Sequence, residues 1–260
     1  GGIAVSARDL SGLEGRRALV TGGSRGVGAA TARLFAEAGA HVVLGYRTRR
    51  DDAARVVAEC RAYGVDAHAV AADISTRAGA ETLVSEAMRA MGGLDCFVAN
   101  AGIWAPEPVG VAEMDDDRWA RTMRENVDSV FFTCRAVARV MGAGGRMVMV
   151  ASTAGQRGEA EHADYAASKG AMIALVKSMC IELAPRDINV NCVAPGWVDT
   201  EMCVIPYADG GRDRIASEIP IGRVATAEDI AGPIVFLCTP LARHITGEIV
   251  NVNGGSVLCG

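Results

Sequence analysis

The chain has 260 residues, 50% of them hydrophobic and 22% charged, so it is able to bury a large core and intrinsic disorder is excluded. Its net charge of −5 comes from 26 basic and 31 acidic residues that are interspersed, which excludes a basic surface for nucleic acid. No apolar run reaches the ~18 residues that a membrane crossing requires, and no signal-peptide pattern occurs, so we expect a soluble cytoplasmic protein that binds no membrane.

From residue 16 onward, short apolar segments alternate with longer segments of helical spacing. The predicted strands are 17–21, 41–45, 67–72, 94–99, 146–151, 188–193 and 248–252. The predicted helices are about 26–39, 52–63, 76–91, 115–141, 162–184 and 226–239. Because the strands are nearly continuous apolar runs, they predict a seven-stranded parallel sheet with helices on both faces, the doubly wound α/β architecture. No linker divides the chain, so we expect one domain at 14–260 after an N-terminal extension at 1–13.

Ligands of such sheets bind beyond the carboxyl ends of the strands. In this position the first strand is followed by the loop TGGSRGVG and then by a strongly helical sequence. Gly22, Gly26 and Gly28 would allow a tight turn and a close approach of the backbone to a pyrophosphate, and the helix start would offer free N–H groups. A tight strand-to-helix turn without a ligand is the alternative. The order of strand, loop and helix favours a dinucleotide site that also includes Ser24 and Val27.

The second strand is followed by Arg47 and lacks the acidic residue that would bind the ribose 2′-hydroxyl of NAD. Arg47, together with Arg25 in the glycine loop, would instead attract a 2′-phosphate, unless both are ordinary surface residues. The sequence therefore predicts NADP(H) in preference to NAD(H).

Two more strand ends carry candidate cofactor residues. Asp73, at the end of the third strand and followed by Ile74, is placed to accept a hydrogen bond from an adenine amino group or to cap the next helix. After the fourth strand, Asn100, Ala101 and Gly102 leave room for a ribose, although they also suit a plain turn.

Candidate catalytic residues follow in the second half of the chain. Tyr165 and Lys169 are four residues apart in a predicted helix, which places the phenol and the ammonium on one face. A nearby positive charge lowers the pKa of a tyrosine from ~10 and suits it to exchange protons near neutral pH, although this spacing alone is more often a surface pair. Ser152, which follows the fifth strand, could bind a substrate carbonyl or merely cap a turn. Asn126 could interrupt the long helix and hold a water, or merely face solvent.

In their order, these residues resemble those of the short-chain dehydrogenases/reductases, and the resemblance covers residues 14–255. It rests on the glycine loop at 21–28, Asn100-Ala101-Gly102, Asn126, Ser152, Tyr165 with Lys169, and Pro195-Gly196 after the sixth strand. The resemblance implies a Rossmann-type fold and hydride transfer between a nicotinamide cofactor and a carbonyl or alcohol group.

The same resemblance implies a role for each residue. Tyr165 is the general acid/base, Ser152 orients the carbonyl, and Lys169 binds the nicotinamide ribose and lowers the pKa of the phenol. Asn126 completes a proton relay. The residues that would cover the nicotinamide are Pro195, Gly196, Val198 and Thr200.

Within this family, segments such as YAASKGAMIALVKS look most like 3-oxoacyl-[acyl-carrier-protein] reductases, which implies fatty acid biosynthesis and an acyl carrier protein as partner. The basic cluster that those reductases carry before the fifth strand is missing here, and Arg186 is left as one docking cation. A reductase of a free alcohol, sugar or polyketide ketone is the alternative. A nucleotide-sensing regulator without catalysis is the alternative from another class.

The poorly patterned segment 203–220 predicts a mobile lid over the substrate. The residues expected to flank the substrate pocket are Trp104, Glu159, His162 and Trp197. We expect no metal, because the acidic segments 115–117 and 159–164 better suit a helix start and a polar loop. The eight cysteines include no C-x-x-C pair and suit buried reduced thiols.

The helices at 115–141 and 162–184 carry more apolar residues than one sheet is able to cover. These residues include Val130, Phe131, Phe132, Ala171, Leu175 and Met179. A second apolar face implies a protein partner. The family resemblance implies that the partners are other copies of the chain, in a homotetramer.

Overall fold

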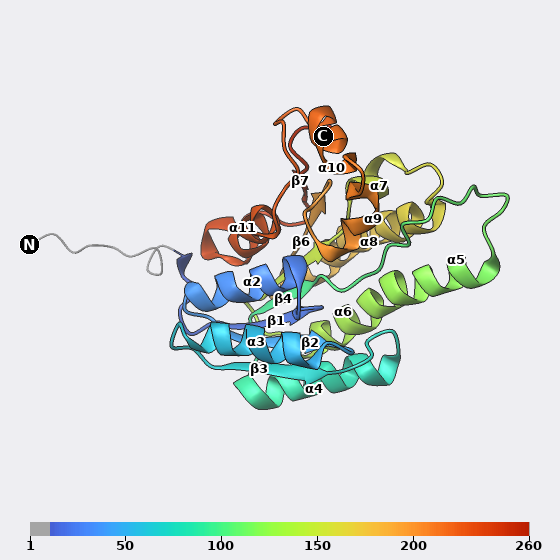
Figure 1. Ribbon diagram of the computed structural model, residues 1–260. Coiled ribbons are helices and arrows are strands. Elements are labelled where there is room, and N and C mark those ends of the chain that lie inside the picture. The colour runs from blue at the N-terminus through green and yellow to red at the C-terminus, as the bar shows by residue number, and fades with distance from the viewer. Residues whose placement is uncertain (1–10, 260) are drawn as a thin grey trace, which may run out of the picture.

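The computed structural model describes residues 11–259, so most of the predicted N-terminal extension lies outside the described residues. Seven parallel strands form one sheet in the order β3-β2-β1-β4-β5-β6-β7 (Figure 1), as expected for a doubly wound α/β domain. The strands are β1 (Arg17–Thr21), β2 (His41–Tyr46), β3 (Ala67–Ala71), β4 (Cys96–Ala99), β5 (Arg146–Val150), β6 (Asn189–Pro195) and β7 (Ile249–Val252).

Helices connect and cover the strands. The longer helices are α2 (Gly26–Glu37), α3 (Arg50–Arg61), α4 (Arg77–Met91), α5 (Asp116–Met123), α6 (Ser129–Val140), α8 (Ala163–Leu183), α10 (Gly211–Glu218) and α11 (Ala227–Cys238). The shorter ones are η1 (Arg124–Asp128), α7 (Thr153–Arg157), η2 (Ala184–Arg186), η3 (Glu201–Cys203), α9 (Val204–Tyr207) and η4 (Pro240–Ala242). The sequence predicted the six main helical segments but neither α10 nor the short helices between them.

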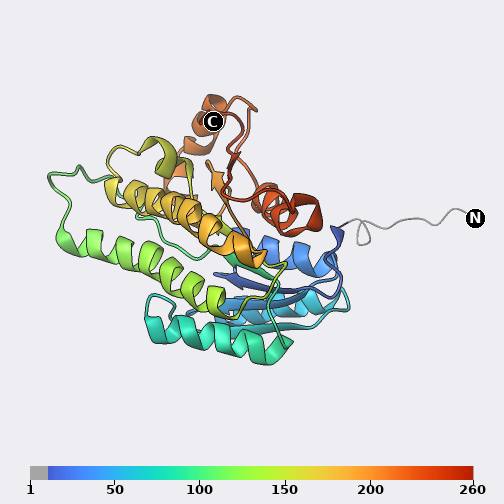
Figure 2. The ribbon, with the colours of Figure 1, turned by 180° about the vertical axis from the view of Figure 1, so that it is seen from behind.

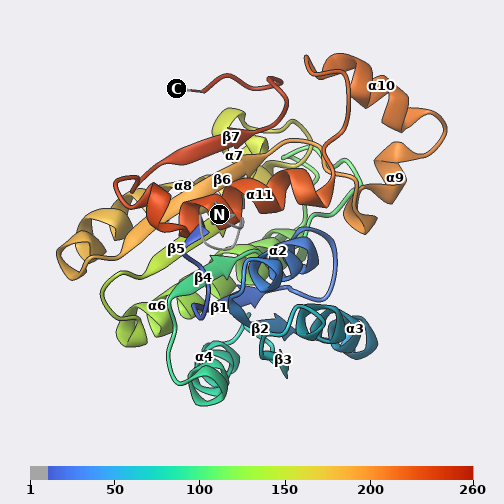
Figure 3. The same cartoon turned by 90° about the vertical axis from the view of Figure 1, so that its left-hand side faces the viewer.

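The sheet lies between two helical layers (Figure 3). Helices α2, α3 and α11 cover one face, and α4, α6 and α8 cover the other. Phe35 and Leu44 are fully buried in the first layer, and Phe97 and Met147 in the second. Leu13, which we assigned to the extension, is also fully buried in the first layer. Because both faces are covered, the central strands are apolar throughout, which explains the continuous runs in the sequence.

The long predicted helix at 115–141 is interrupted. Asp115 begins α5 by accepting a hydrogen bond from the Arg118 N–H at 2.6 Å, so the acidic run is a helix start, as expected. A π-helical turn, Arg124–Asp128, then joins α5 to α6. Asn126 lies in this turn and is fully buried, which confirms the suggested interruption and shows that the alternative of a solvent-facing side chain is wrong.

The segment 203–220 is more regular than the sequence indicated, because it contains α9 and α10 in place of an unpatterned loop. Between these helices Gly210 has a φ of +77°, and a Cβ on Gly211 would lie 2.0 Å from the Pro206 carbonyl oxygen. The two glycines therefore permit a tight turn that other residues would obstruct.

The cysteines are free thiols throughout residues 11–259, as expected. Seven are buried, and Cys259 is exposed. In the same part of the chain no helix is long and apolar enough to span a membrane. No three or more His, Cys, Asp or Glu side chains there are grouped so that they could hold a metal ion.

Candidate active site

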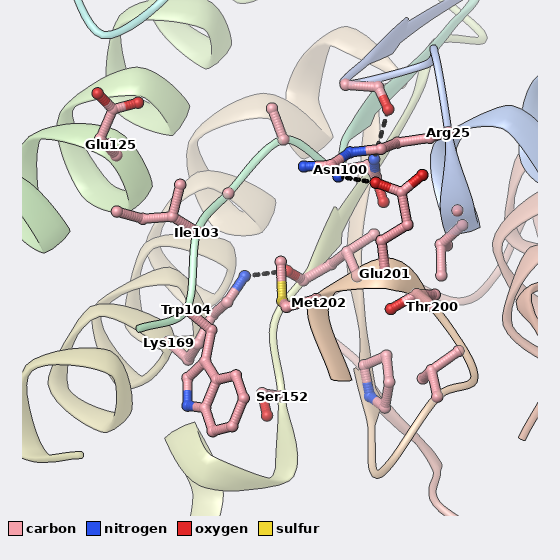
Figure 4. A pocket seen from close by; sticks show the side chains of 18 of the residues that line it. Arg25, Asn100, Ile103, Trp104, Glu125, Ser152, Lys169, Thr200, Glu201 and Met202 are labelled. Carbon is pink, nitrogen blue, oxygen red and sulfur yellow. Dashed lines mark hydrogen bonds and ion pairs between the residues drawn. The ribbon is translucent and has the colours of Figure 1, made fainter. Parts of the chain in front are cut away.

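A cavity of about 510 Å³ opens at the carboxyl ends of the strands (Figure 4). Of the predicted site residues it is lined by Gly22, Ser24, Arg25, Gly26, Val27, Arg47, Asp73, Ile74, Asn100, Ala101, Gly102, Trp104, Ser152, Glu159, Tyr165, Lys169, Pro195, Gly196, Trp197, Val198 and Thr200. Gly28, Asn126 and His162 do not line it. The cavity thus joins the glycine loop at one end to the predicted catalytic residues at the other.

The glycine loop is packed so tightly that side chains would not fit. Gly26 has a φ of +52°, and a Cβ on Gly28 would lie 2.3 Å from the Gly22 carbonyl oxygen and 2.5 Å from Nδ2 of Asn100. Arg25 at the start of α2 makes no side-chain cap, so it leaves the first N–H groups of this helix without a capping hydrogen bond. These features fit a pyrophosphate at the helix start.

Thr21 and Asn100 connect the ends of β1 and β4. The Thr21 hydroxyl accepts hydrogen bonds from the N–H groups of Asn100 at 3.0 Å and Ala101 at 3.1 Å, and Asn100 Nδ2 donates to the Thr21 carbonyl at 3.0 Å. These bonds fix the floor of the cavity. This role of Thr21 was not predicted from the sequence, although a polar residue at the end of a buried strand was a usable signal.

Acidic side chains pair with the arginines at the glycine-loop end. Glu201 accepts hydrogen bonds from Arg25 and from Arg49, the latter at 3.0 Å. Glu125 Oε1 and Oε2 lie 2.8 and 2.7 Å from Nη1 of Arg47. Neither acid was predicted from the sequence, because each comes from a segment far along the chain from the arginine that it binds.

Asp73 also lines this end of the cavity. It accepts hydrogen bonds from the Ser75 N–H at 3.1 Å and the Ser75 hydroxyl at 2.7 Å, which lower the pKa of its carboxyl group. Thr76, not Asp73, caps α4 by accepting a hydrogen bond from the Gly79 N–H. The alternative that Asp73 caps this helix is therefore wrong.

Asn126 lies behind the cavity wall and uses both ends of its amide. Its Oδ1 accepts from the Ile103 N–H at 2.7 Å, and its Nδ2 donates to the Ile103 carbonyl at 2.9 Å and the Ser168 hydroxyl at 3.0 Å. The π turn thereby holds the segment after β4 against α8. Ser168, which lies one residue before Lys169, was missed by the sequence analysis.

Ser152, Tyr165 and Lys169 meet at the other end of the cavity. The Ser152 hydroxyl caps α7 by accepting from the Ala154 N–H at 3.1 Å, so the suggested capping role is present while the residue also lines the cavity. Lys169 Nζ donates to the Val150 carbonyl at 2.9 Å and lies 5.6 Å from the centre of the Tyr165 ring.

The electrostatics of this group differ from the sequence expectation. Burial raises the pKa of Tyr165 above its ordinary value, although a hydrogen bond with Ser152 acts in the opposite direction. Burial also lowers the pKa of Lys169 to about 8. The pKa of Tyr165 is therefore raised where a lowered value was expected from the sequence, because desolvation outweighs the hydrogen bond with Ser152. A protonated phenol suits a proton donor.

Aromatic rings surround the space beside Tyr165. The ring of Trp104 lies 6.4 Å from that of Tyr165 and 6.0 Å from that of Trp197, measured between centres. His162 packs behind Trp104 at 5.0 Å and is buried, so it supports the wall of the cavity instead of flanking the cavity as expected.

The chain is similar to several known proteins over almost its whole length. A family model described as enoyl-(acyl carrier protein) reductase matches residues 22–256. Versicolorin reductase 1 of Aspergillus parasiticus is 36% identical over 94% of this chain and 97% of its own. The 3-oxoacyl-[acyl-carrier-protein] reductase FabG of Vibrio cholerae is 37% identical over 94% and 98%. The structure of a short-chain dehydrogenase from Burkholderia cenocepacia in complex with NADP is similar with a TM-score of 0.89, at 36% identity over 94% and 99% of the two chains.

Proposed function

The chain belongs to the short-chain dehydrogenase/reductase family of oxidoreductases, and from this premise we propose that it reduces ketone carbonyl groups with NADPH. One observation carries the proposal: Ser152, Tyr165 and Lys169 lie together at one end of a cavity whose other end is the glycine loop. A proton donor for the substrate oxygen and a phosphate-binding loop thus line one cavity, as a dinucleotide-dependent reductase requires.

The reduction requires a hydride on the carbonyl carbon and a proton on the oxygen. A bound nicotinamide cofactor supplies the hydride. Tyr165 gives its phenolic proton to the oxygen as negative charge develops there, and the Ser152 hydroxyl holds the same oxygen by a hydrogen bond. The ammonium of Lys169 stabilises the phenolate left behind, which then recovers a proton from solvent.

Replacing Tyr165 by Phe tests this mechanism. Tyr165→Phe should keep the affinity for NADPH, measured by fluorescence titration, and lower kcat on the order of 10²–10⁴-fold, the usual contribution of a positioned proton donor. Ketone reduction at the wild-type rate would contradict the assignment. A nucleotide-sensing regulator, our alternative from another class, would bind NADPH and reduce no ketone even with Tyr165 present.

We propose NADP(H) as the preferred cofactor because three arginines, Arg25, Arg47 and Arg49, line the glycine-loop end of the cavity. A guanidinium group there offers paired donors to a 2′-phosphate. The NADP bound to the relative from Burkholderia cenocepacia supports this choice. We also propose that Asp73 accepts a hydrogen bond from the amino group of the adenine.

Two substrate classes follow from the relatives. A 3-oxoacyl thioester carried by an acyl carrier protein is the first, by analogy with FabG. A free small ketone is the second class. It is supported by the hydrogen bonds of Arg186, the one candidate cation for docking a carrier protein. Arg186 donates hydrogen bonds to the carbonyls of Ala138 at 2.5 Å and Met141 at 2.7 Å, so two of its donors are used within the chain. Comparing acetoacetyl-carrier protein with a free ketone of equal chain length separates the two classes.

We further propose that the enzyme is a cytoplasmic homotetramer assembled through the outer faces of α6 and α8, which lie side by side (Figure 2). Phe131 and Ile181 are 42% and 75% exposed on these helices. Val130 and Met179, which we counted with the outer face from the sequence, are buried in the core instead. Exposed apolar side chains on adjacent helices favour contact with another copy.

A further inference from the structure

The substrate end of the cavity has an aromatic wall, which we define as Trp104, Trp197 and Tyr207. The ring centres of Trp104 and Trp197 are 6.0 Å apart, and those of Trp197 and Tyr207 are also 6.0 Å apart. Trp104 and Trp197 line the cavity beside Tyr165. Indole rings offer broad, flat contact surfaces, which pack best against a ring or another flat group.

The aromatic wall is held from behind by a buried polar network. Nη2 of Arg118 lies 3.3 Å from Nδ1 of His162, and since a guanidinium only donates, this histidine nitrogen accepts. Asp164, which is 1% exposed, accepts hydrogen bonds from the Thr122 hydroxyl at 2.7 Å and from Arg118 Nε at 3.3 Å. His162 is thereby fixed against Trp104 at 5.0 Å. A wall fixed in this way is preorganised for its ligand.

One carboxyl group at this end of the cavity lacks a partner. Glu159 lines the cavity, and within residues 11–259 its carboxylate makes no hydrogen bond or ion pair. Burial raises its pKa, while His162 and Arg157 act in the opposite direction. The backbone around it is fixed, because Glu161 takes a φ of +63° and its carbonyl accepts from the Val109 N–H at 2.9 Å.

The other charges near this end compensate for Glu159 only in part, because no described residue forms a hydrogen bond or an ion pair with its carboxylate. Arg157 and Glu218 also line the cavity, and both are exposed to solvent. Lys169 donates to the Val150 carbonyl and lies beside the phenol of Tyr165. A half-buried carboxylate costs free energy unless it is hydrogen-bonded or paired with a positive charge. A bound substrate that supplies such a partner would recover that cost.

We propose that the substrate is a ketone attached to a flat ring, and that the ring carries an amine or a hydroxyl group that binds Glu159. This inference rests on the proposed ketone reduction and selects the free ketone over the carrier-bound acyl chain. The ring packs on Trp104 and Trp197, and a protonated amine is favoured further by the faces of the indoles. Reduction converts the ketone to a secondary alcohol, with the hydride from NADPH on carbon and the Tyr165 proton on oxygen.

Three acetophenones of similar shape test the role of Glu159. They carry an aminomethyl, a hydroxymethyl or a carboxylate group in the para position, and kcat/KM is measured for each with NADPH at pH 7.5. We expect the amine to exceed the carboxylate by at least about tenfold, which is 1.4 kcal/mol, with the hydroxyl compound between them. Glu159→Gln should bring kcat/KM for the amine and for the carboxylate within about twofold of each other.

Glu161→Gln is the matched control, because Glu161 belongs to the same loop but is exposed and outside the cavity. It should preserve the tenfold preference. The proposal would be overturned if Glu159→Gln preferred the amine over the carboxylate as strongly as wild type does. A wild-type preference for the carboxylate would overturn it as well.

A second comparison tests the aromatic wall. Trp104→Ala should lower kcat/KM for the hydroxymethyl acetophenone by about tenfold, and for the open-chain ketone ethyl acetoacetate by less than threefold. Equal losses for the two ketones would overturn the choice of a flat ring. Wild-type enzyme that reduces neither the acetophenones nor ethyl acetoacetate would contradict the proposed function itself, and the substrate class with it.

Discussion

Arg47 and Glu125 form an ion pair that joins the end of β2 to the π turn containing Asn126. Both carboxylate oxygens of Glu125 are within 2.8 Å of Nη1 of Arg47, and Asp73 Oδ1 lies 3.9 Å from the same nitrogen. The arginine that we expect to bind a 2′-phosphate is thus already neutralised by acids of the same chain. A phosphate must compete with Glu125 for this guanidinium.

Neutralising Glu125 should therefore increase selectivity for NADP(H). We expect Glu125→Gln to raise the ratio of NADP⁺ to NAD⁺ affinity about fivefold, since a partly exposed charge pair contributes up to about 1 kcal/mol. Arg47→Ala should lower NADP⁺ affinity about tenfold and leave NAD⁺ affinity nearly unchanged. Isothermal titration calorimetry measures both dissociation constants without turnover.

The control for this experiment is Glu86→Gln, which also deprives an arginine of its partner but lies on α4 outside the cavity. It should leave the affinity ratio unchanged. A lower ratio in Glu125→Gln would mean that Glu125 orients Arg47 for the phosphate instead of competing with it.

Lys169 should make the stability of the protein depend on pH above 8. Burial lowers the pKa of Lys169 to about 8, from an unperturbed 10.5, so between these values the unfolded chain binds more protons than the folded one. The contribution of this group to the free energy of unfolding therefore rises with pH across this window, by at most about 1.4 kcal/mol per unit. The difference in unfolding free energy between wild type and Lys169→Met should rise from pH 8 to pH 10 in urea titrations.

Lys177→Met is the control for this pH series, because Lys177 is exposed on the same helix. Its difference from wild type should stay constant with pH. A constant difference for Lys169→Met as well would show that burial does not perturb this ammonium.

Asn126 should contribute to stability as well as to catalysis. Asn126→Ala leaves the N–H and the carbonyl of Ile103 without the partners that the amide supplies. We expect a loss on the order of 3 kcal/mol in the free energy of unfolding, since each buried polar group left unpaired costs roughly 1–3 kcal/mol. Asn251→Ala, at an exposed position, should cost less than about 1 kcal/mol. Equal effects of the two substitutions would contradict a structural role for Asn126.

The sheet was predictable from the sequence because burial on both faces leaves an uninterrupted apolar run, as at 146–150, where every residue is buried. The carboxyl ends of those runs then located Ser152 and Asn100. Glu125 and Glu201 were not predictable, because their importance depends on which distant arginines they meet in space. The direction of the pKa shift of Tyr165 was also not predictable from the sequence, since residue spacing places Tyr165 near Lys169 but does not show how deeply the phenol is buried.

The outer faces of α6 and α8 should form an interface between copies of the chain. Ile181 is 75% exposed on α8, and burying an isoleucine in an interface contributes roughly 1.5–3 kcal/mol, whereas a buried unpaired carboxylate costs several kcal/mol. Wild type should therefore sediment at about four times the chain mass of 27.0 kDa, and Ile181→Glu should sediment as a smaller species. Val111→Glu, at an equally exposed position outside these helices, should leave the assembly intact. Sedimentation of the wild type at 27.0 kDa would contradict the proposed tetramer, and an unchanged mass for Ile181→Glu would place the interface on another face.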